Sequence, residues 1–169
     1  MSRIAIVGHR DLGSASAEAF VAQTSRTVLA EARRRWERVD AASALAVGAD
    51  TLFAEAALEL DLPLHVVTPF AEYESDFDEP QARRRHAGLR ARAVTETRLP
   101  FYARSDGAYE AAMRWVVDTS DLLVAAWDGR PSEGRGGTGH AVSYALATGR
   151  PVVHLDLAER AIRTYGSQP

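Results

Sequence analysis

Cysteine and lysine are both absent from this chain of 169 residues, and each absence excludes a class of chemistry. Without cysteine there is no disulfide framework, no thiolate nucleophile and no cysteine-ligated metal site. All 20 basic residues are arginine, so no lysine is there to form a Schiff base or to bind phosphate as in a P-loop. The histidines, at positions 9, 65, 86, 140 and 154, are scattered along the chain, so the sequence predicts no metal site.

Long apolar runs are missing as well. The first residues, MSRIAIVGHR, hold an apolar run of strand length, and no later stretch approaches the ~20 apolar residues of a membrane span. We therefore expect a cytoplasmic protein with no membrane partner. The net charge of −3 provides no basic field, and the arginine runs at 33–35 and 83–85 lie near acidic residues, as on solvated helix faces. The composition thus argues against a nucleic-acid partner.

The chain does contain a regular alternation of strand and helix patterns. Short apolar runs predict strands at 3–7, 43–47, 63–67, 94–99, 121–126 and 151–155. Helices are predicted at 15–38, 51–60, 79–92, 108–118 and 139–147, and the tail is expected to fray. Strands that are apolar throughout and alternate with helices indicate a mainly parallel sheet with helices on both faces. We predict a doubly wound α/β fold, with residues 1–169 forming a single domain.

Two glycine-bearing loops follow strands of this predicted sheet. One is GHRDLG at 8–13, and the other runs over 127–139 and contains GRGGTG. In a doubly wound sheet, ligands bind where such loops meet at the carboxyl ends of the strands. Glycines let the backbone approach an anion, and the start of the next helix offers unpaired N–H groups to a phosphate. Thr138 adds a hydroxyl as helix N-cap or ligand donor, and Arg10 can hold a phosphate in bidentate fashion.

The turn VGAD, after the second predicted strand, offers a further candidate. Gly48 permits a tight turn at this point. Asp50 is placed either to cap the following helix, which is the commoner role of such a residue, or to accept a hydrogen bond from a ribose hydroxyl. Taken together, the residues expected to bind a ligand are Gly8, His9, Arg10, Gly48, Asp50, Asp128, Gly136, Gly137, Thr138, Gly139 and His140.

Four segments, taken in order, resemble the SLOG superfamily: VGHRDL, ALAVGADTLFAEAALELDLPLHVVTPF, VVDTSDLLVAAWDG and GGTGHAVSYALATGRPVV. The resemblance covers residues 3–155. It implies a Rossmann-like fold, as in the LOG-type phosphoribohydrolases, the DNA-processing A proteins and small members proposed to sense nucleotide-derived ligands such as ADP-ribose. It also implies that the GGTG loop binds phosphate and that Gly8 and Arg10 line the same pocket.

The resemblance does not extend to a catalytic group. LOG-type enzymes carry the motif P-G-G-x-G-T-x-x-E, in which the glutamate is catalytic. Here Arg135 stands in place of the proline, His140 in place of the threonine and Ser143 in place of the glutamate. The region from DLLVAAWDG to GRPVV is also similar to nucleoside 2-deoxyribosyltransferases, whose nucleophilic glutamate is again missing, because Ala141, Val142 and Ser143 occupy the helix start.

Two functions are predicted on these grounds. The first is a sensor or carrier that binds a nucleotide-derived phosphate ligand, of the ADP-ribose or nucleoside phosphate type, at the glycine-rich loop without turnover and without a further cofactor. The alternative is a hydrolase or transferase acting on the N-glycosidic bond of a nucleotide, which normally needs a carboxylate. His9, His140 and Asp50 are its candidates, Glu72 is another acid, and the catalytic residues stay unassigned. A homo-oligomer is expected, since small α/β domains often pair through helix faces.

Overall fold

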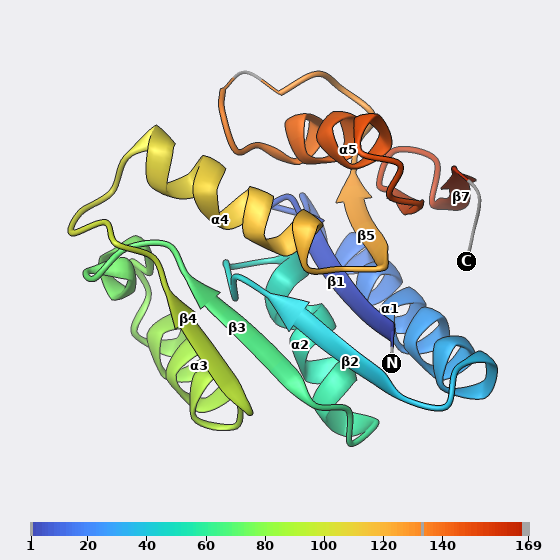
Figure 1. Cartoon of the computed structure of the whole chain (residues 1–169), viewed down its shortest axis with the longest axis horizontal. Coiled ribbons are helices and arrows are strands. Elements are labelled where there is room, and N and C mark those ends of the chain that lie inside the picture. The colour runs from blue at the N-terminus through green and yellow to red at the C-terminus, as the bar shows by residue number, and fades with distance from the viewer. Residues whose placement is uncertain (1, 133, 167–169) are drawn as a thin grey trace.

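The computed structural model describes residues 2–132 and 134–166. At its centre is a seven-stranded sheet in the order β4-β3-β2-β1-β5-β6-β7 (Figure 1). Strands β1 to β6 pair in parallel, and β7 pairs antiparallel with β6. The strands are β1 (Ser2–Gly8), β2 (Val39–Ser43), β3 (Leu64–Thr68), β4 (Thr95–Arg98), β5 (Leu122–Trp127), β6 (Val152–Asp156) and β7 (Ala161–Tyr165).

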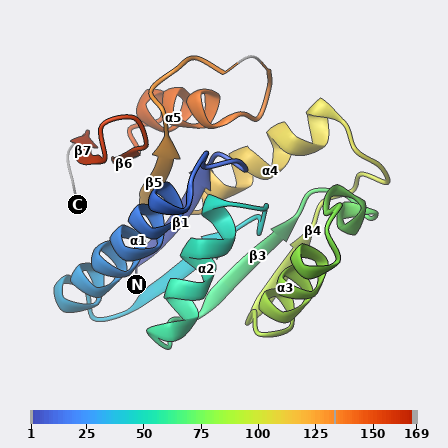
Figure 2. The same ribbon diagram turned by 180° about the vertical axis from the view of Figure 1, so that it is seen from behind.

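Helices cover both faces of this sheet. The helices are α1 (Ala15–Arg35), α2 (Ala49–Glu59), α3 (Pro80–Ala91), α4 (Asp106–Asp118) and α5 (Thr138–Ala147), with a short 3₁₀ helix, η1 (Tyr73–Asp76), before α3. On one face lie α1, α2 and α3, and on the other lie α4 and α5 (Figure 1, Figure 2). The predicted doubly wound α/β fold is therefore confirmed. Among the described residues, no helix is long and apolar enough to cross a membrane.

Alternate residues of the central strands serve the two faces. Ile4 and Ile6 of β1 pack into the core beneath α1 and α2, while Ala5 between them packs on the side of α4 and α5. In β5, Val124 faces the first core and Leu123 faces the second. Because both faces are buried, these strands are apolar throughout, which is why the sequence shows continuous apolar runs.

The winding of the chain reverses between β1 and β5. From β1 the chain adds β2, β3 and β4 on one side, and then returns to place β5 on the other side. The two strands pair from Ile4 with Leu122 to Gly8 with Ala126, so their carboxyl ends lie next to each other. The loops that follow β1 and β5 therefore meet at the topological switch point, as predicted.

Two elements differ from the sequence predictions. β2 comprises Val39–Ser43, whereas the apolar run predicts a strand over 43–47. Leu45, in the loop that follows β2, is fully buried with a φ of 54°. A loop that dips into the core is as apolar as a strand, so the prediction was displaced along the chain. The frayed tail was also wrong over the described residues, because β7 pairs with β6 along its whole length.

Candidate functional site

Two hollows lie at the switch point and share one wall. We call the first the inner cavity: it has a volume of ≈ 120 Å³ and lies among β1, α4 and the start of α2. We call the second the outer recess: it has a volume of ≈ 520 Å³ and opens between the loops after β1 and β5. Four residues line both hollows, namely Gly8, Arg10, Gly136 and Thr138. The outer recess is in the ~300–1,000 Å³ range of ligand pockets, and the inner cavity is smaller.

The N-terminus of α5 opens onto the outer recess. Its cap residue, Gly137, makes no side-chain hydrogen bond to the helix. The N–H of His140 donates to Ser132 Oγ at 3.0 Å, and the N–H of Gly136 donates to His140 Nδ1 at 3.2 Å. Within the described part of the chain, no acceptor takes the N–H groups of Gly137, Thr138 or Gly139. A helix end with free N–H groups and the positive end of its dipole favours an anion.

The glycines of this loop have a packing role that the sequence did not reveal. A Cβ on Gly136, whose φ is +80°, would lie 2.9 Å from the carbonyl carbon of Tyr109 in α4. A Cβ on Gly137 would lie 2.6 Å from Ser132 Oγ, and one on Gly139 would lie 2.9 Å from a backbone oxygen. The lack of side chains therefore lets the loop fold against α4 and against itself. The expected close approach to an anion is an additional role that this packing leaves open.

Arg10 enters the shared wall already paired. Its Nη2 lies 2.9 Å from Oδ2 of Asp76, a carboxylate from η1 whose side chain is only 3% exposed. Arg104 Nε lies 3.1 Å from Oδ1 of the same carboxylate, and the Tyr109 hydroxyl donates to Asp76 as well. The Arg10 guanidinium also lies over the Tyr109 ring. Asp76 thus joins the loop after β1, η1 and the start of α4, and it fixes where the Arg10 charge lies.

His9 and Asp128 connect the two loops across the outer recess. His9 Nε2 lies 3.1 Å from Asp128 Oδ1, joining the loop after β1 to the loop after β5. The backbone N–H of Arg130 donates to the same carboxylate at 3.0 Å, and this bond, together with His9, holds the pKa of Asp128 below its usual value. Both predicted residues therefore shape the rim of the recess.

Asp50 is the acidic group of the inner cavity, and it does not cap α2. The cap position belongs to Gly48, and no side chain caps the helix, so the capping role predicted for Asp50 is wrong. Asp50 Oδ2 instead accepts hydrogen bonds from Ser43 Oγ at 3.1 Å and from the Ala46 N–H at 3.4 Å. The residue is 5% exposed, and this burial raises the pKa of Asp50 to about 6.

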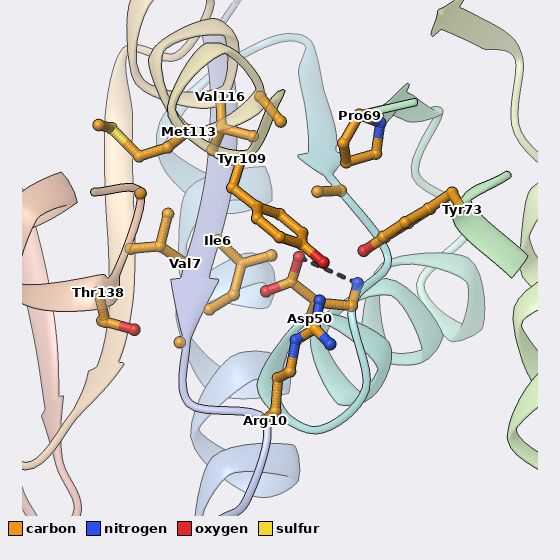
Figure 3. Close-up of a pocket in the computed structure, with 15 residues that line it drawn as sticks. Ile6, Val7, Arg10, Asp50, Pro69, Tyr73, Tyr109, Met113, Val116 and Thr138 are labelled. Carbon is orange, nitrogen blue, oxygen red and sulfur yellow. Dashed lines mark hydrogen bonds between the residues drawn. The ribbon is translucent and has the colours of Figure 1, made fainter. Parts of the chain in front are cut away.

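Figure 3 shows how the polar groups of the inner cavity are arranged. Asp50, Tyr73, Tyr109 and Arg10 converge on one side of it, facing the apolar side chains of β1 and α4. The ring of Tyr73 is held by edge contacts with Phe70, Phe77 and His86. Its hydroxyl has no hydrogen-bond partner among the described residues, and burial raises the pKa of Tyr73 far above its usual value.

The remaining predicted residues lie outside these two hollows. Gly48 has a φ of +89°, and a Cβ there would lie 2.3 Å from the backbone oxygen of Arg10, so its role is to let α2 start against the loop after β1. Gly139, His140 and Ser143 line a separate depression on the far side of the glycine-rich loop. The exposed Ser143 donates its hydroxyl to the Gly139 carbonyl at 3.0 Å. Thr138 is the first residue of α5 and not its cap.

Several residues of the site were not predicted from the sequence. Tyr73 and Asp76 belong to the segment 71–79, which looked merely polar, and Arg104 and Tyr109 come from the start of α4. The usable signal was the aromatic spacing of FAEYESDF, since aromatic residues within an acidic segment indicate that it returns to the core. The described residues contain no group of three or more histidine, aspartate or glutamate side chains that could hold a metal ion.

Comparison with solved structures relates this fold to known proteins. The chain is similar to DNA processing protein A from Streptococcus pneumoniae, with a TM-score of 0.65 and 18% identity over 91% of this chain and 50% of that one. It is similar to DNA processing protein A from Helicobacter pylori, whose structure concerns binding of single-stranded DNA, with a TM-score of 0.61 and 17% identity over 90% and 64%. It is also similar to TM1055, a structural genomics target, with a TM-score of 0.58 and 13% identity over 90% and 72%.

These likenesses define the class of protein by its fold. The chain has the SLOG-like Rossmann fold that its sequence motifs predict. No protein-family model matches the sequence, and no curated protein matches it either. The chain spans only half the length of the S. pneumoniae protein. The single-stranded DNA bound by the H. pylori protein means that the comparison lends no support to the expected absence of a nucleic-acid partner. The homo-oligomer and the cytoplasmic location stay predictions.

Proposed function

We propose that this protein binds a nucleotide-derived ligand through its phosphate groups, at the outer recess. The observation that carries the proposal is the N-terminus of α5, where the N–H groups of Gly137, Thr138 and Gly139 lack acceptors among the described residues. These donors face the loop after β1 across the switch point, which is where doubly wound sheets bind phosphorylated ligands.

Arginines supply positive charge on three sides of the proposed phosphate position. Arg10 lines the recess from the loop after β1, and Arg130 and Arg135 line it from the loop after β5. The side chains of Arg130 and Arg135 are 85% and 77% exposed, so both are able to move toward a ligand. Arg10 is held by Asp76 and offers a fixed charge instead. A preformed donor set of this kind suits a mono- or diphosphate.

We propose that binding occurs without turnover, as in a sensor or carrier. The LOG-type enzymes carry their catalytic glutamate at the position that corresponds to Ser143. In this chain Ser143 is bonded to the backbone of its own helix and lines neither the inner cavity nor the outer recess. His9 and His140 are occupied by the loops, through Asp128 and Gly136.

A thermal-shift panel with product analysis tests the proposal. The panel contains AMP, ADP, ADP-ribose, NAD, a short single-stranded DNA and inorganic phosphate. A ligand at 100 times its Kd stabilises a protein by about 2.7 kcal/mol, which is readily measured. We expect a shift with the nucleotide phosphates and intact ligand at the end of the incubation. The absence of a shift with every phosphate compound would contradict the proposal, and a response to the oligonucleotide alone would make DNA the ligand.

One observation favours a second candidate, the cleavage of an N-glycosidic bond. Asp50 faces the inner cavity and burial raises its pKa to about 6, so it is poised to exchange a proton near neutral pH. Release of free base or ribose phosphate in the same panel would establish this activity. Its loss in Asp50→Asn, with ligand binding retained, would assign the acid–base role to that carboxyl group. No release at high protein concentration would exclude it.

A further inference from the structure

The inner cavity contains two buried polar groups with unused hydrogen-bonding capacity. The hydroxyl of Tyr73 opens into the cavity and has no partner among the described residues, although the whole residue is only 3% exposed. Both hydrogen bonds that Asp50 accepts from described residues go to Oδ2, which leaves Oδ1 to a group inside the cavity. Buried tyrosine hydroxyls and carboxylates nearly always have partners, so this pair indicates a ligand group that donates and accepts hydrogen bonds.

The charges of the cavity exclude a second phosphate as that group. The only cation that lines the inner cavity among the described residues is Arg10, and the Asp76 carboxylate already neutralises it at 2.9 Å. A phosphate in the cavity would therefore face the Asp50 carboxylate without a free positive charge. A neutral group with hydroxyls has no such conflict, because it can donate to Asp50 and exchange a hydrogen bond with Tyr73.

The geometry of the two hollows limits the size and place of this group. Thr138 and Arg10 line both hollows, so whatever fills the inner cavity is bonded directly to the phosphate in the outer recess. A volume of ≈ 120 Å³ is below the ~300–1,000 Å³ of a pocket for a drug-sized ligand, so the cavity suits one small ring. In a nucleotide-derived ligand, the ring next to the phosphate is the pentose.

We propose that the inner cavity binds the pentose of a phosphorylated ligand, with sugar hydroxyls bonded to Asp50 Oδ1 and to the Tyr73 hydroxyl. This inference rests on the proposed function, because it takes the phosphate to lie at α5. It narrows the ligand class to pentose phosphates whose hydroxyls are free, with any base or second phosphate directed outward. The apolar walls from Ile6, Val7 and Met113 then pack against the sugar ring.

Titrations with three probes separate the sugar from the phosphate. The probes are inorganic phosphate, ribose 5-phosphate and tetrahydrofurfuryl phosphate, which has the ring and the phosphate but no hydroxyl group. We expect ribose 5-phosphate to bind about 10- to 100-fold more tightly than tetrahydrofurfuryl phosphate, the usual range for hydrogen bonds to a charged group. Equal affinity of these two compounds would overturn the inference.

Two variants assign the difference to the named residues. Tyr73→Phe removes a hydroxyl that has no protein partner, so its stability without ligand should match that of the wild type. It should lose most of the preference for ribose 5-phosphate and keep its affinity for tetrahydrofurfuryl phosphate, as should Asp50→Asn. Tyr102→Phe, which removes the hydroxyl of a tyrosine that is 75% exposed, is the matched control and should keep the full preference. A Tyr73→Phe variant that retains the preference would overturn the inference.

The two proposals fail in different ways in this experiment. If neither ribose 5-phosphate nor tetrahydrofurfuryl phosphate binds, the phosphate site itself is refuted, and the sugar site with it. If both bind with the same affinity, the phosphate site is supported and the pentose assignment alone is refuted.

Discussion

The Nη2 atom of Arg10 lies 2.9 Å from Oδ2 of Asp76, which connects the loop after β1 to η1, 66 residues further along the chain. The carboxylate is almost fully buried, while the guanidinium is 40% exposed and faces the hollows. This pair fixes the direction of the Arg10 charge before any ligand arrives. It also brings Tyr73, three residues before Asp76, to the wall of the inner cavity.

Replacing Asp76 should weaken the fold around the site. Asp76→Asn removes the charge that holds Arg10, Arg104 and the Tyr109 hydroxyl. Because both arginines remain partly solvated, we expect a loss of roughly 1–3 kcal/mol in the free energy of unfolding, measured in urea. Asp78→Asn changes an exposed aspartate of the same segment and should cost less than about 0.5 kcal/mol. Equal effects of the two substitutions would show that the Asp76 cluster does not stabilise the fold.

The pH dependence of stability should report on Asp50. Its pKa is raised from 3.8 to about 6 in the folded state, so between these values the folded protein binds more protons than the unfolded chain. Stability due to this group is therefore present at low pH, falls as pH rises through that window, and levels off above it. Asp50→Asn removes the dependence, so we expect it to exceed the wild type by about 1–3 kcal/mol at neutral pH.

Urea denaturation of both proteins across this pH range checks the prediction. The difference in unfolding free energy between Asp50→Asn and the wild type should grow from pH 4 to pH 7. A difference that stays constant with pH would mean that the Asp50 carboxyl titrates at its ordinary value.

Two glycines with the same backbone conformation should differ in their tolerance of alanine. Gly48 and Gly13 have φ values of +89° and +81°, but a Cβ on Gly48 would lie 2.3 Å from the Arg10 carbonyl oxygen, whereas a Cβ on Gly13 would meet nothing within 4 Å. Gly13→Ala should cost only the left-handed conformation, about 1–2 kcal/mol. Gly48→Ala should cost more, because the loop after β1 must move. Thermal denaturation compares the two, and equal losses would contradict this packing.

The fixed and the exposed arginines of the outer recess should contribute unequally to binding. Arg10→Gln removes a guanidinium oriented by Asp76, and we expect the affinity for ADP-ribose to fall about 10- to 100-fold. Arg135→Gln removes a side chain that is 77% exposed, and we expect a loss of about fivefold or less. Calorimetric titration measures both. A larger loss in Arg135→Gln than in Arg10→Gln would place the phosphate toward the loop after β5.

Much of the fold could be predicted from the chain because its physical causes are local. The apolar runs of β1, β5 and β6 are buried on both faces, and the glycine-rich loop between β5 and α5 marks the switch point. β2 was displaced because Leu45 is buried in a loop and contributes the same apolar signal as a strand residue. β7 was missed because three of its five residues are exposed, so it has no apolar pattern and depends on its pairing with β6.

The site was predicted only in part, for a related reason. Gly8, Arg10 and Thr138 stand next to strand and helix ends, where sequence position alone indicates a role. Asp76 and Tyr73 reach the same place through tertiary contacts with Arg10 and the ring of Phe70, and no local pattern encodes these contacts. The carboxylate that orients the cation and the hydroxyl that lines the cavity therefore required the structure.

One substitution tests the phosphate site at α5 most directly. Thr138 is the first residue of the helix, where proline is well tolerated, and Gly137 before it has an extended ψ of 165°, which suits a following proline. Thr138→Pro thus removes one N–H donor with little change in backbone, and Thr138→Ala, which keeps the N–H, controls for loss of the side chain. Titrated calorimetrically with ADP-ribose, Thr138→Pro should bind at least about tenfold more weakly than Thr138→Ala. Equal binding by the two variants would show that the phosphate does not lie at the N-terminus of α5.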